Sequence, residues 1–236
     1  MKLLLFDVDG TLVRTGGAGV RGMERAMERA LGVAEGLRGL TMGGGVDPAI
    51  LREGLRTNAP GRFPPGPAED AALRAVLEIY PDELADEIAR AEAYRVPSGV
   101  LEILPALAAL AARGAVLLAL GTGNVERGAR IKLARAALND FFPFGGFADD
   151  AEERAGVLRA GVRRAEERAG RPIPPGDVTV VGDTARDVAA ARAIGARAVA
   201  VATGFVSIEA LRAAEPDVAL PDLAAPGALQ ALGLAS

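Results

Sequence analysis

Short apolar segments alternate with longer segments of helical periodicity along most of this chain, and this alternation constrains the fold more than any other feature. Each buried parallel strand of an α/β protein reads as a short apolar run, and a helix then returns the chain to the start of the next strand. Strands are expected over residues 3–6, 115–120, 178–181, 198–202 and 218–220. Helices are expected near residues 100–112, 125–138, 151–169, 185–194 and 207–214. The pattern therefore predicts the α/β class, with a parallel sheet and crossover helices as the core.

One long segment, residues 14–96, departs from this rhythm because it contains no convincing strand. Large apolar residues recur in it at helical spacing, at Val20, Met23, Met27 and Leu31. Further helices are expected over residues 48–56, 69–79 and 82–94, with a loop at 58–67 and a return hinge at 95–99. The sequence therefore predicts two domains, a core formed by residues 1–13 and 97–236 and a small helical domain formed by residues 14–96.

The composition excludes several kinds of chemistry and partner. The chain has no Cys and no His, which removes disulfides, thiol nucleophiles, imidazole bases and the usual zinc ligands, so any catalysis must rest on carboxylates. The net charge is -4 and basic residues are interspersed with acidic ones, so no nucleic-acid partner is expected. No apolar stretch is long enough to span a membrane, and the N-terminal apolar run ends too early, at Asp7, for a signal peptide. A cytoplasmic location is expected.

Two carboxylates, Asp7 and Asp9, follow the first expected strand in the sequence LLLFDVDGTL. Residues two apart in a strand face the same side, so both side chains can project together at the carboxyl end of the strand. Open parallel sheets bind their ligands at this edge, and Gly10 permits a tight turn there. Acids that merely cap a turn are the alternative. The complete pattern Asp-x-Asp-Gly-Thr favours a ligand site, because so many specified residues seldom coincide by chance.

A second polar cluster follows the strand expected at residues 115–120. Thr122 supplies a hydroxyl, Gly123 a flexible backbone, and Asn124 begins a helix whose first amides favour an anion. Together these residues can bind a phosphate oxygen. The alternative is an ordinary turn in which Asn124 caps the following helix.

A third cluster, Asp183 and Asp187, brings two more carboxylates to the same edge of the sheet, after the strand expected at 178–181. Like charges this close repel and raise one another's pKa values unless a cation intervenes. A hard divalent cation, most simply Mg²⁺, suits such a site because it binds one or two carboxylates together with a substrate phosphate. The alternatives are helix capping for Asp183 and a solvated helix face for Asp187.

Taken in order, the motifs DVDGT at 7–11, Thr122 and GDTARD at 182–187 resemble those of the haloacid dehalogenase superfamily. The resemblance implies a parallel Rossmann-like sheet with a helical cap domain inserted after the first motif, here residues 14–96. Phosphoglycolate-phosphatase-like members are the most similar, since residues 145–150 read GGFADD, like the turn that follows the third strand of those proteins. These motifs are specific for the superfamily and say little about the substrate.

The resemblance also implies a role for each motif residue. Asp7 would be the nucleophile that attacks phosphorus and forms an aspartyl phosphate. Asp9 would be the acid and base that protonates the leaving alkoxide and then takes a proton from water. Asp183, Asp7 and the backbone carbonyl of Asp9 would bind Mg²⁺, which stabilises charge on the phosphoryl oxygens. Asp187 would lie behind these ligands.

The superfamily further uses a Lys or Arg that neutralises the nucleophile and the phosphate group, and the candidates are Lys132 and Arg154. Lys132 lies about seven residues into the helix after Thr122, hence on the order of 10 Å from the edge of the sheet. Arg154 is favoured because it begins a helix for which Asp149 and Asp150 are the expected N-cap. Lys132 is retained as a residue that binds the substrate phosphate. The alternatives are a surface ion pair with Asp150 for Arg154 and a solvated helix face for Lys132.

The acidic clusters predict a Mg²⁺-dependent phosphatase acting on a small phosphorylated metabolite. The resemblance implies a phosphoglycolate-like or sugar phosphate ester as that metabolite, and an aspartyl-phosphate intermediate. A dehalogenase is disfavoured because a departing halide needs no acid such as Asp9. A sugar-phosphate mutase of the same superfamily is the alternative, and a non-catalytic phospho-ligand-binding protein is another. The sequence identifies neither the substrate nor the oligomeric state, and it is compatible with a homodimer.

Overall fold

A six-stranded, all-parallel sheet in the order β3-β2-β1-β4-β5-β6 forms the centre of the computed structural model, which describes residues 1–234. Its strands are β1 (Lys2–Phe6), β2 (Val116–Gly121), β3 (Gly145–Gly146), β4 (Val178–Gly182), β5 (Arg197–Val201) and β6 (Val218–Leu220). The predicted α/β class with a Rossmann-like parallel sheet is confirmed. Residues 235 and 236, the end of the predicted core domain, lie outside the described residues.

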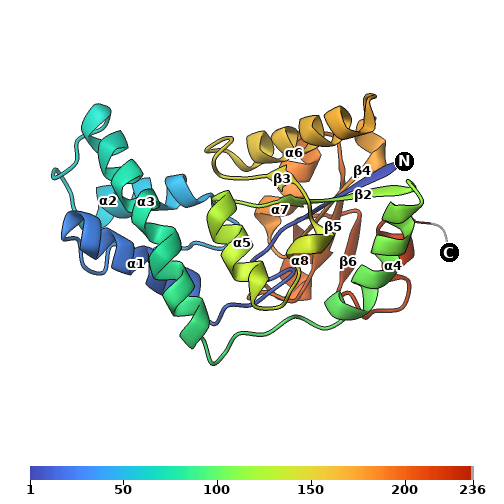
Figure 1. Ribbon diagram of the computed structural model, residues 1–236, viewed down its shortest axis with the longest axis horizontal. Helices are drawn as coiled ribbons and strands as arrows, with labels where there is room; N and C mark the ends of the chain where they lie inside the picture. Colours follow the sequence, from blue (N-terminus) through green and yellow to red (C-terminus); the bar gives the residue numbers. More distant parts are fainter. Residues whose placement is uncertain (235–236) are drawn as a thin grey trace.

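Helices cover both faces of this sheet (Figure 1), which explains why its strands are continuous apolar runs. They are α4 (Val100–Ala112), α5 (Glu126–Ala134), α6 (Arg154–Ala169), α7 (Ala185–Ala193), α8 (Ile208–Ala213) and α9 (Ala228–Ala231), with short 3-10 turns at Asn139–Phe141 and Pro175–Asp177. In β1, Leu4 and Phe6 pack with α4 and α5, whereas Leu3 and Leu5 pack with α6 and α7. The central strand is therefore anchored on both sides, which fixes the position of the residues that follow it.

Residues 14–96 form a helical lobe beside the sheet, at the left of Figure 1. Its helices are α1 (Ala18–Leu31), α2 (Asp47–Asn58) and α3 (Pro67–Arg90). The two connections to the core run side by side, since Arg14 and Arg95 exchange backbone hydrogen bonds of 2.8 and 2.9 Å. Met23 and Met27 of α1 pack with Val76 of α3 in an apolar cluster that also takes in Val125 and Val157 of the core, so the lobe is packed onto the sheet domain. None of the helices within residues 1–234 is both long and apolar enough to span a membrane.

The lobe also contains a difference from the sequence prediction. Two helices were expected over residues 69–79 and 82–94, but α3 is a single helix that contains Pro81 and ends at Arg90. Proline removes one backbone hydrogen bond from a helix interior. Both halves of α3 contact α1. Ion pairs such as Arg25 to Glu83 at 3.0 Å hold the half after Pro81, and Val76 of the half before it packs in the same apolar cluster as Met23.

In the core, the prediction missed β3 and α9 and placed the end of α5 too late. Strand β3 consists of two glycines, so it has no apolar run to reveal it. Helix α5 ends at Ala134 rather than near residue 138, and Ala137 then adopts a φ of 55°. This early turn lets the chain reach the edge of the sheet in a short connection.

Candidate active site

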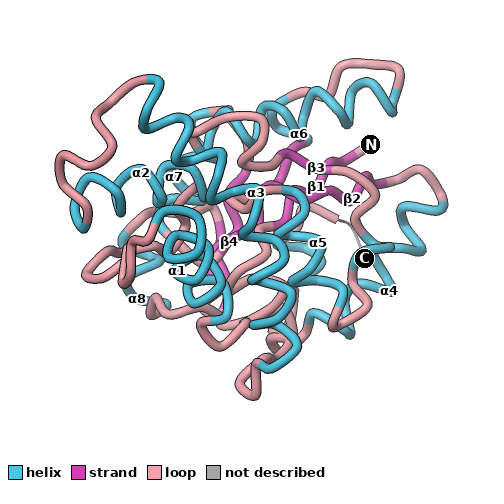
Figure 2. Tube along the Cα trace, turned by 60° about the vertical axis from the view of Figure 1, so that its left-hand side comes forward, coloured by secondary structure: helices cyan, strands magenta, loops and turns pink. Residues whose placement is uncertain are grey.

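Asp7, Thr122 and Asp183 stand directly beyond the carboxyl ends of β1, β2 and β4, the three adjacent central strands. Because these strands are parallel, their carboxyl ends lie together, and the three predicted motifs meet at one edge of the sheet. In Figure 2, where the helical lobe comes forward, α1, α2 and α3 lie over this edge. The site is thus enclosed between the sheet and the lobe.

Asp7 is buried and paired with Arg154, whose Nη2 atom lies 2.8 Å from Asp7 Oδ1 and 2.5 Å from Asp187 Oδ1. Burial raises the pKa of Asp7 to about 6, although Arg154 opposes this shift. Burial would also lower the pKa of the Arg154 guanidinium, but Asp187 and Asp7 outweigh it and hold that pKa above its ordinary value. Arg154 therefore stays charged and neutralises part of the acidic cluster.

Asp187 is held by the start of α7. Its Oδ2 atom accepts hydrogen bonds from the backbone amide and the hydroxyl of Thr184, at 3.1 and 2.7 Å, in a capping box. Thr184, and not Asp183, is the N-cap of α7, so helix capping does not explain Asp183. The solvated helix face considered for Asp187 is wrong, since the residue is buried. Its carboxylate fixes Arg154 against Asp7.

Asp183 is the least satisfied acid of the site. Its Oδ1 atom is buried without a hydrogen-bond partner in the part of the chain that the structure describes. Burial, Asp7 and Asp187 together raise the pKa of Asp183 to about 9. One carboxylate oxygen from each of these three residues lies within 4.8 Å of the others. A buried, unpaired carboxylate among like charges fits the oxygen ligands that a hard divalent cation requires.

Gly10 makes room for this carboxylate. It adopts a φ of 80°, a left-handed conformation that favours glycine, and a Cβ atom there would overlap the Asp183 side chain. The Thr203 hydroxyl donates to the Gly10 carbonyl at 2.6 Å and holds the turn in place. The tight turn expected after Asp9 is therefore also what allows the first and third motifs to approach.

Asp9 and the second motif form a hydrogen-bonded network. The side-chain amide of Asn124 donates to Thr122 Oγ1 at 2.8 Å and to Asp9 Oδ2 at 2.9 Å. Lys132 donates to Asp9 Oδ2 at 2.6 Å and to Asn124 Oδ1 at 2.5 Å. The expectation that Lys132 lies on the order of 10 Å away is wrong, as is the solvated helix face. The distance was estimated from the rise per residue along the helix axis. That estimate leaves out the length of the lysine side chain and the fact that α5 runs past Asp9.

The helix that follows the second motif is capped from the helical lobe rather than by Asn124. Val125 is the N-cap residue of α5, and its amide donates to Asp47 Oδ2 at 2.9 Å. The Asp47 amide in turn donates to the Gly123 carbonyl at 2.7 Å. Burial raises the pKa of Asp47 to about 6, and Lys132 opposes the shift. The sequence analysis missed Asp47, because its Asp-Pro pair signals only a helix start and not the partner of that helix.

Replacing Asp47 with Ala is expected to loosen this junction. The buried Val125 amide would lose its acceptor, and an unsatisfied buried donor costs about 1–3 kcal/mol. Hydrogen exchange followed by NMR should therefore show faster exchange of the Val125 amide, with unchanged exchange at the centre of β4. Asp47→Asn, which keeps an acceptor oxygen, serves as the control. Equal protection of the Val125 amide in the Ala variant and the wild type would contradict this account.

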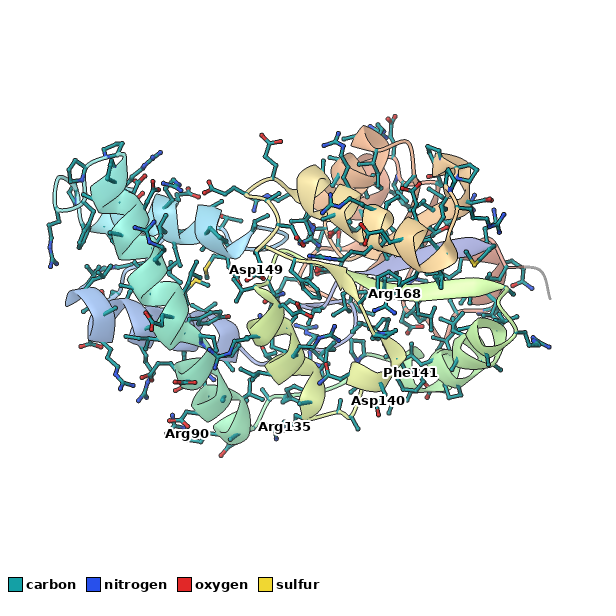
Figure 3. All side chains as sticks on the ribbon, turned by 45° about the horizontal axis from the view of Figure 1, so that its top comes forward. Arg90, Arg135, Asp140, Phe141, Asp149 and Arg168 are labelled. Atoms are coloured by element: carbon teal, nitrogen blue, oxygen red, sulfur yellow. The ribbon has the colours of Figure 1, made fainter. Side chains whose placement is uncertain are left out.

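Further contacts close the helical lobe onto the core. Arg52 of α2 pairs with Glu152 at 2.7 Å, and Arg186 of α7 donates to the Gly43 carbonyl at 3.1 Å. At the far end of the lobe, Arg135 lies beside the end of α3 (Figure 3) and donates to the Ala91 carbonyl at 2.9 Å. A Cβ atom on Gly123 would overlap the Gly45 carbonyl, so only glycine permits the loop to approach this closely.

The residues expected to cap α6 have other partners. Glu153 is the N-cap of α6. Asp149, at the junction of lobe and core in Figure 3, accepts from the Glu126 amide at 2.6 Å at the start of α5. Asp150 pairs with Arg164 at 2.6 and 2.8 Å. The surface pair with Asp150 considered for Arg154 is therefore wrong, and Arg154 is turned into the site.

Comparisons with known proteins bear on this arrangement. Residues 1–195 match the family model described as haloacid dehalogenase-like hydrolase. A predicted phosphoglycolate phosphatase from Haemophilus somnus superposes with a TM-score of 0.66 and 21% identity, over 95% of each chain. CbbY from Rhodobacter sphaeroides in complex with phosphate superposes with a TM-score of 0.64 and 22% identity, over 99% of this chain and 100% of that one. At such identities the likeness concerns the fold. No curated protein is significantly similar to this sequence.

Proposed function

The chain belongs to the haloacid dehalogenase-like hydrolase family, and from this premise we propose that it is a Mg²⁺-dependent phosphatase acting on a small phosphorylated metabolite. The observation that carries the proposal is the meeting of a buried carboxylate, Asp7, with the Arg154 cation and the unpaired Asp183 carboxylate at one edge of the sheet. Similar folds described as a predicted phosphoglycolate phosphatase and as a phosphate complex support the choice of a phosphate ester.

The donor set fits a hard divalent cation. Asp183 and Asp7 would hold Mg²⁺, together with the backbone carbonyl of Asp9. The ion, when bound, supplies positive charge that offsets the repulsion among the carboxylates and stabilises the charge on the phosphoryl oxygens. Asp187 contributes less to the ion because Arg154 and Thr184 already occupy its oxygens. The helical lobe then acts as the cap that excludes water from the site.

The chain's own residues perform the transfer in two steps. Asp7 attacks phosphorus and forms an aspartyl phosphate, while the bond from phosphorus to the leaving oxygen breaks and Asp9 gives that oxygen a proton. Asp9 then takes a proton from the water that attacks the aspartyl phosphate, so that inorganic phosphate leaves and the Asp7 carboxylate is restored. Arg154 reduces the repulsion between the Asp7 carboxylate and the anionic ester.

The loop after β2 is the proposed cradle of the phosphoryl group. The Thr122 hydroxyl and the backbone of Gly123 and Asn124 precede the first turn of α5. The first amides of that helix already donate to Asp47 and Asp149, so the cradle depends on the loop rather than on the start of the helix. Asp47 keeps this loop in place from the lobe, so the cradle is complete only when the lobe is closed. The cytoplasmic location and the homodimer stay predictions from the sequence.

Purified protein supplied with Mg²⁺ is expected to release inorganic phosphate from para-nitrophenyl phosphate and from at least one ester of a metabolite panel. Chelation with EDTA should stop the reaction and added Mg²⁺ should restore it, because the acidic cluster needs a cation. Phosphate retained in an isomeric sugar phosphate would instead identify the mutase alternative. No turnover of any ester would reject the phosphatase in favour of a non-catalytic binding protein.

A further inference from the structure

Lys132 is one of only two lysines in the chain, and it is buried beside Asp9. Its Nζ atom donates to Asp9 Oδ2 at 2.6 Å, and the Asn124 amide donates to the same oxygen at 2.9 Å. Among the residues that the structure describes, no hydrogen bond reaches Asp9 Oδ1, and 43% of the Asp9 side chain is exposed. One oxygen of Asp9 is therefore held in place while the other is free to face a ligand.

Groups of the helical lobe restrain the lysine itself. The Tyr94 hydroxyl donates to the Lys132 backbone carbonyl at 2.7 Å, and Tyr80 of α3 and Asp47 of α2 favour the charged form of its ammonium. Burial alone would lower the pKa of Lys132, but the surrounding groups, Asp9 first among them, outweigh burial and keep the pKa above its ordinary value. Lys132 is therefore a fixed, charged contact between the lobe and Asp9.

We propose that Lys132 is a positioning residue for Asp9, which it holds by Oδ2 so that Oδ1 can exchange a proton with the leaving oxygen. The inference rests on the proposed phosphatase function and deepens it, because it gives Lys132 a role other than binding the phosphate group. Its hydrogen bonds go to Asp9 and Asn124, whereas the cation beside the proposed nucleophile is Arg154. The lobe then takes part in placing the acid, because Tyr94 holds the Lys132 backbone and Asp47 holds the start of α5.

The leaving group distinguishes a positioned acid from a phosphate ligand. An alkoxide needs a proton as it departs, whereas para-nitrophenolate is stable enough to leave without one, so only the alkyl ester depends on general acid catalysis. The ratio kcat/KM reports the steps up to formation of the aspartyl phosphate. The later hydrolysis of that intermediate, which is the same for every ester, therefore does not obscure the comparison.

The test measures kcat/KM for para-nitrophenyl phosphate and for the best alkyl phosphate of the panel, with wild type, Lys132→Met, Asp9→Asn and the double variant. Lys132→Met is expected to lower kcat/KM for the alkyl phosphate on the order of 10²-fold and that for the aryl phosphate less than about 3-fold. In the Asp9→Asn background the same substitution should add little, because both changes remove one function. Inhibition by inorganic phosphate should stay near the wild-type value.

Lys2→Met is the matched control, since Lys2 forms a half-buried pair with Asp177 at the start of β1, the end of the strand opposite the site. It should leave both esters unaffected. Thermal unfolding by circular dichroism shows whether each variant folds. If Lys132→Met does not fold, Lys132→Gln, which keeps a donor on a shorter, uncharged side chain, is expected to show a smaller loss that is still selective for the alkyl ester.

Other outcomes would overturn the inference. Equal losses on both esters, with weaker inhibition by inorganic phosphate, would make Lys132 a phosphate ligand. Equal losses with unchanged inhibition would make its role structural. An additive effect in the Asp9→Asn background would show that Lys132 does not act through Asp9. If wild type cleaves neither ester, the proposed phosphatase function fails and this inference fails with it, an outcome distinct from the other three.

Discussion

Replacing Asp7 with Asn is expected to abolish phosphate-ester hydrolysis, with kcat/KM reduced by at least about 10⁴-fold. An amide cannot form the aspartyl phosphate, so no slower version of the same route remains. The substitution preserves the shape of a side chain buried against Arg154. A phosphate-release assay with an excess of Mg²⁺ measures the loss.

Asp177→Asn is the control for this loss, because it makes the same chemical change in a half-buried pair with Lys2 away from the site. It should retain full activity. Circular dichroism should show that both variants are folded, since Arg154 keeps its second partner, Asp187, when Asp7 is changed. An Asp7→Asn protein that is folded and retains more than a few per cent of the wild-type rate would exclude Asp7 as the nucleophile.

The edge of the sheet could be predicted from the sequence because it depends on local periodicity. A short apolar run fixes a buried strand, and the residues directly after it must lie at the carboxyl end, as Asp7 and Asp183 do. Parallel pairing then brings these ends together without further information. The same reasoning failed for β3, whose two glycines have no apolar signal, although the turn that follows it is where Arg154 begins α6.

The contacts made by long side chains and by the lobe could not be predicted in this way. The position of Lys132 along α5 gave too large a distance, because the direction of that helix is set by packing against α3 and the sheet. Asp47 carries a signal only for the start of its own helix, and its partners Gly123 and Val125 are on a segment far away in the sequence. The contacts between two domains depend on both of their surfaces together. The periodicity of the sequence indicates which residues of each domain are buried, but not which residues of one domain meet those of the other.

Arg154→Met is expected to reduce kcat/KM on the order of 10²- to 10³-fold, the range typical for loss of one group that stabilises transition-state charge. The variant leaves the carboxylates of Asp7 and Asp187 without their shared cation and close to Asp183. It should also be less stable than wild type, because breaking a buried ion pair leaves uncompensated charge. Activity with saturating Mg²⁺ and thermal unfolding of the same preparations measure the two effects.

Two comparisons decide whether the loss comes from the charge beside Asp7. Arg164→Met changes a second arginine of α6, which pairs with Asp150, so it should lower stability while kcat/KM stays near that of wild type. Arg154→Lys keeps the charge but offers one ammonium in place of a planar guanidinium, so it should recover most of the activity. If Arg154→Met were no less active than Arg164→Met, Arg154 would serve only to hold α6 against Asp187. The cation of the proposed reaction would then have to be another residue, and Lys132, which already reaches Asp9, is the other candidate that the sequence predicted.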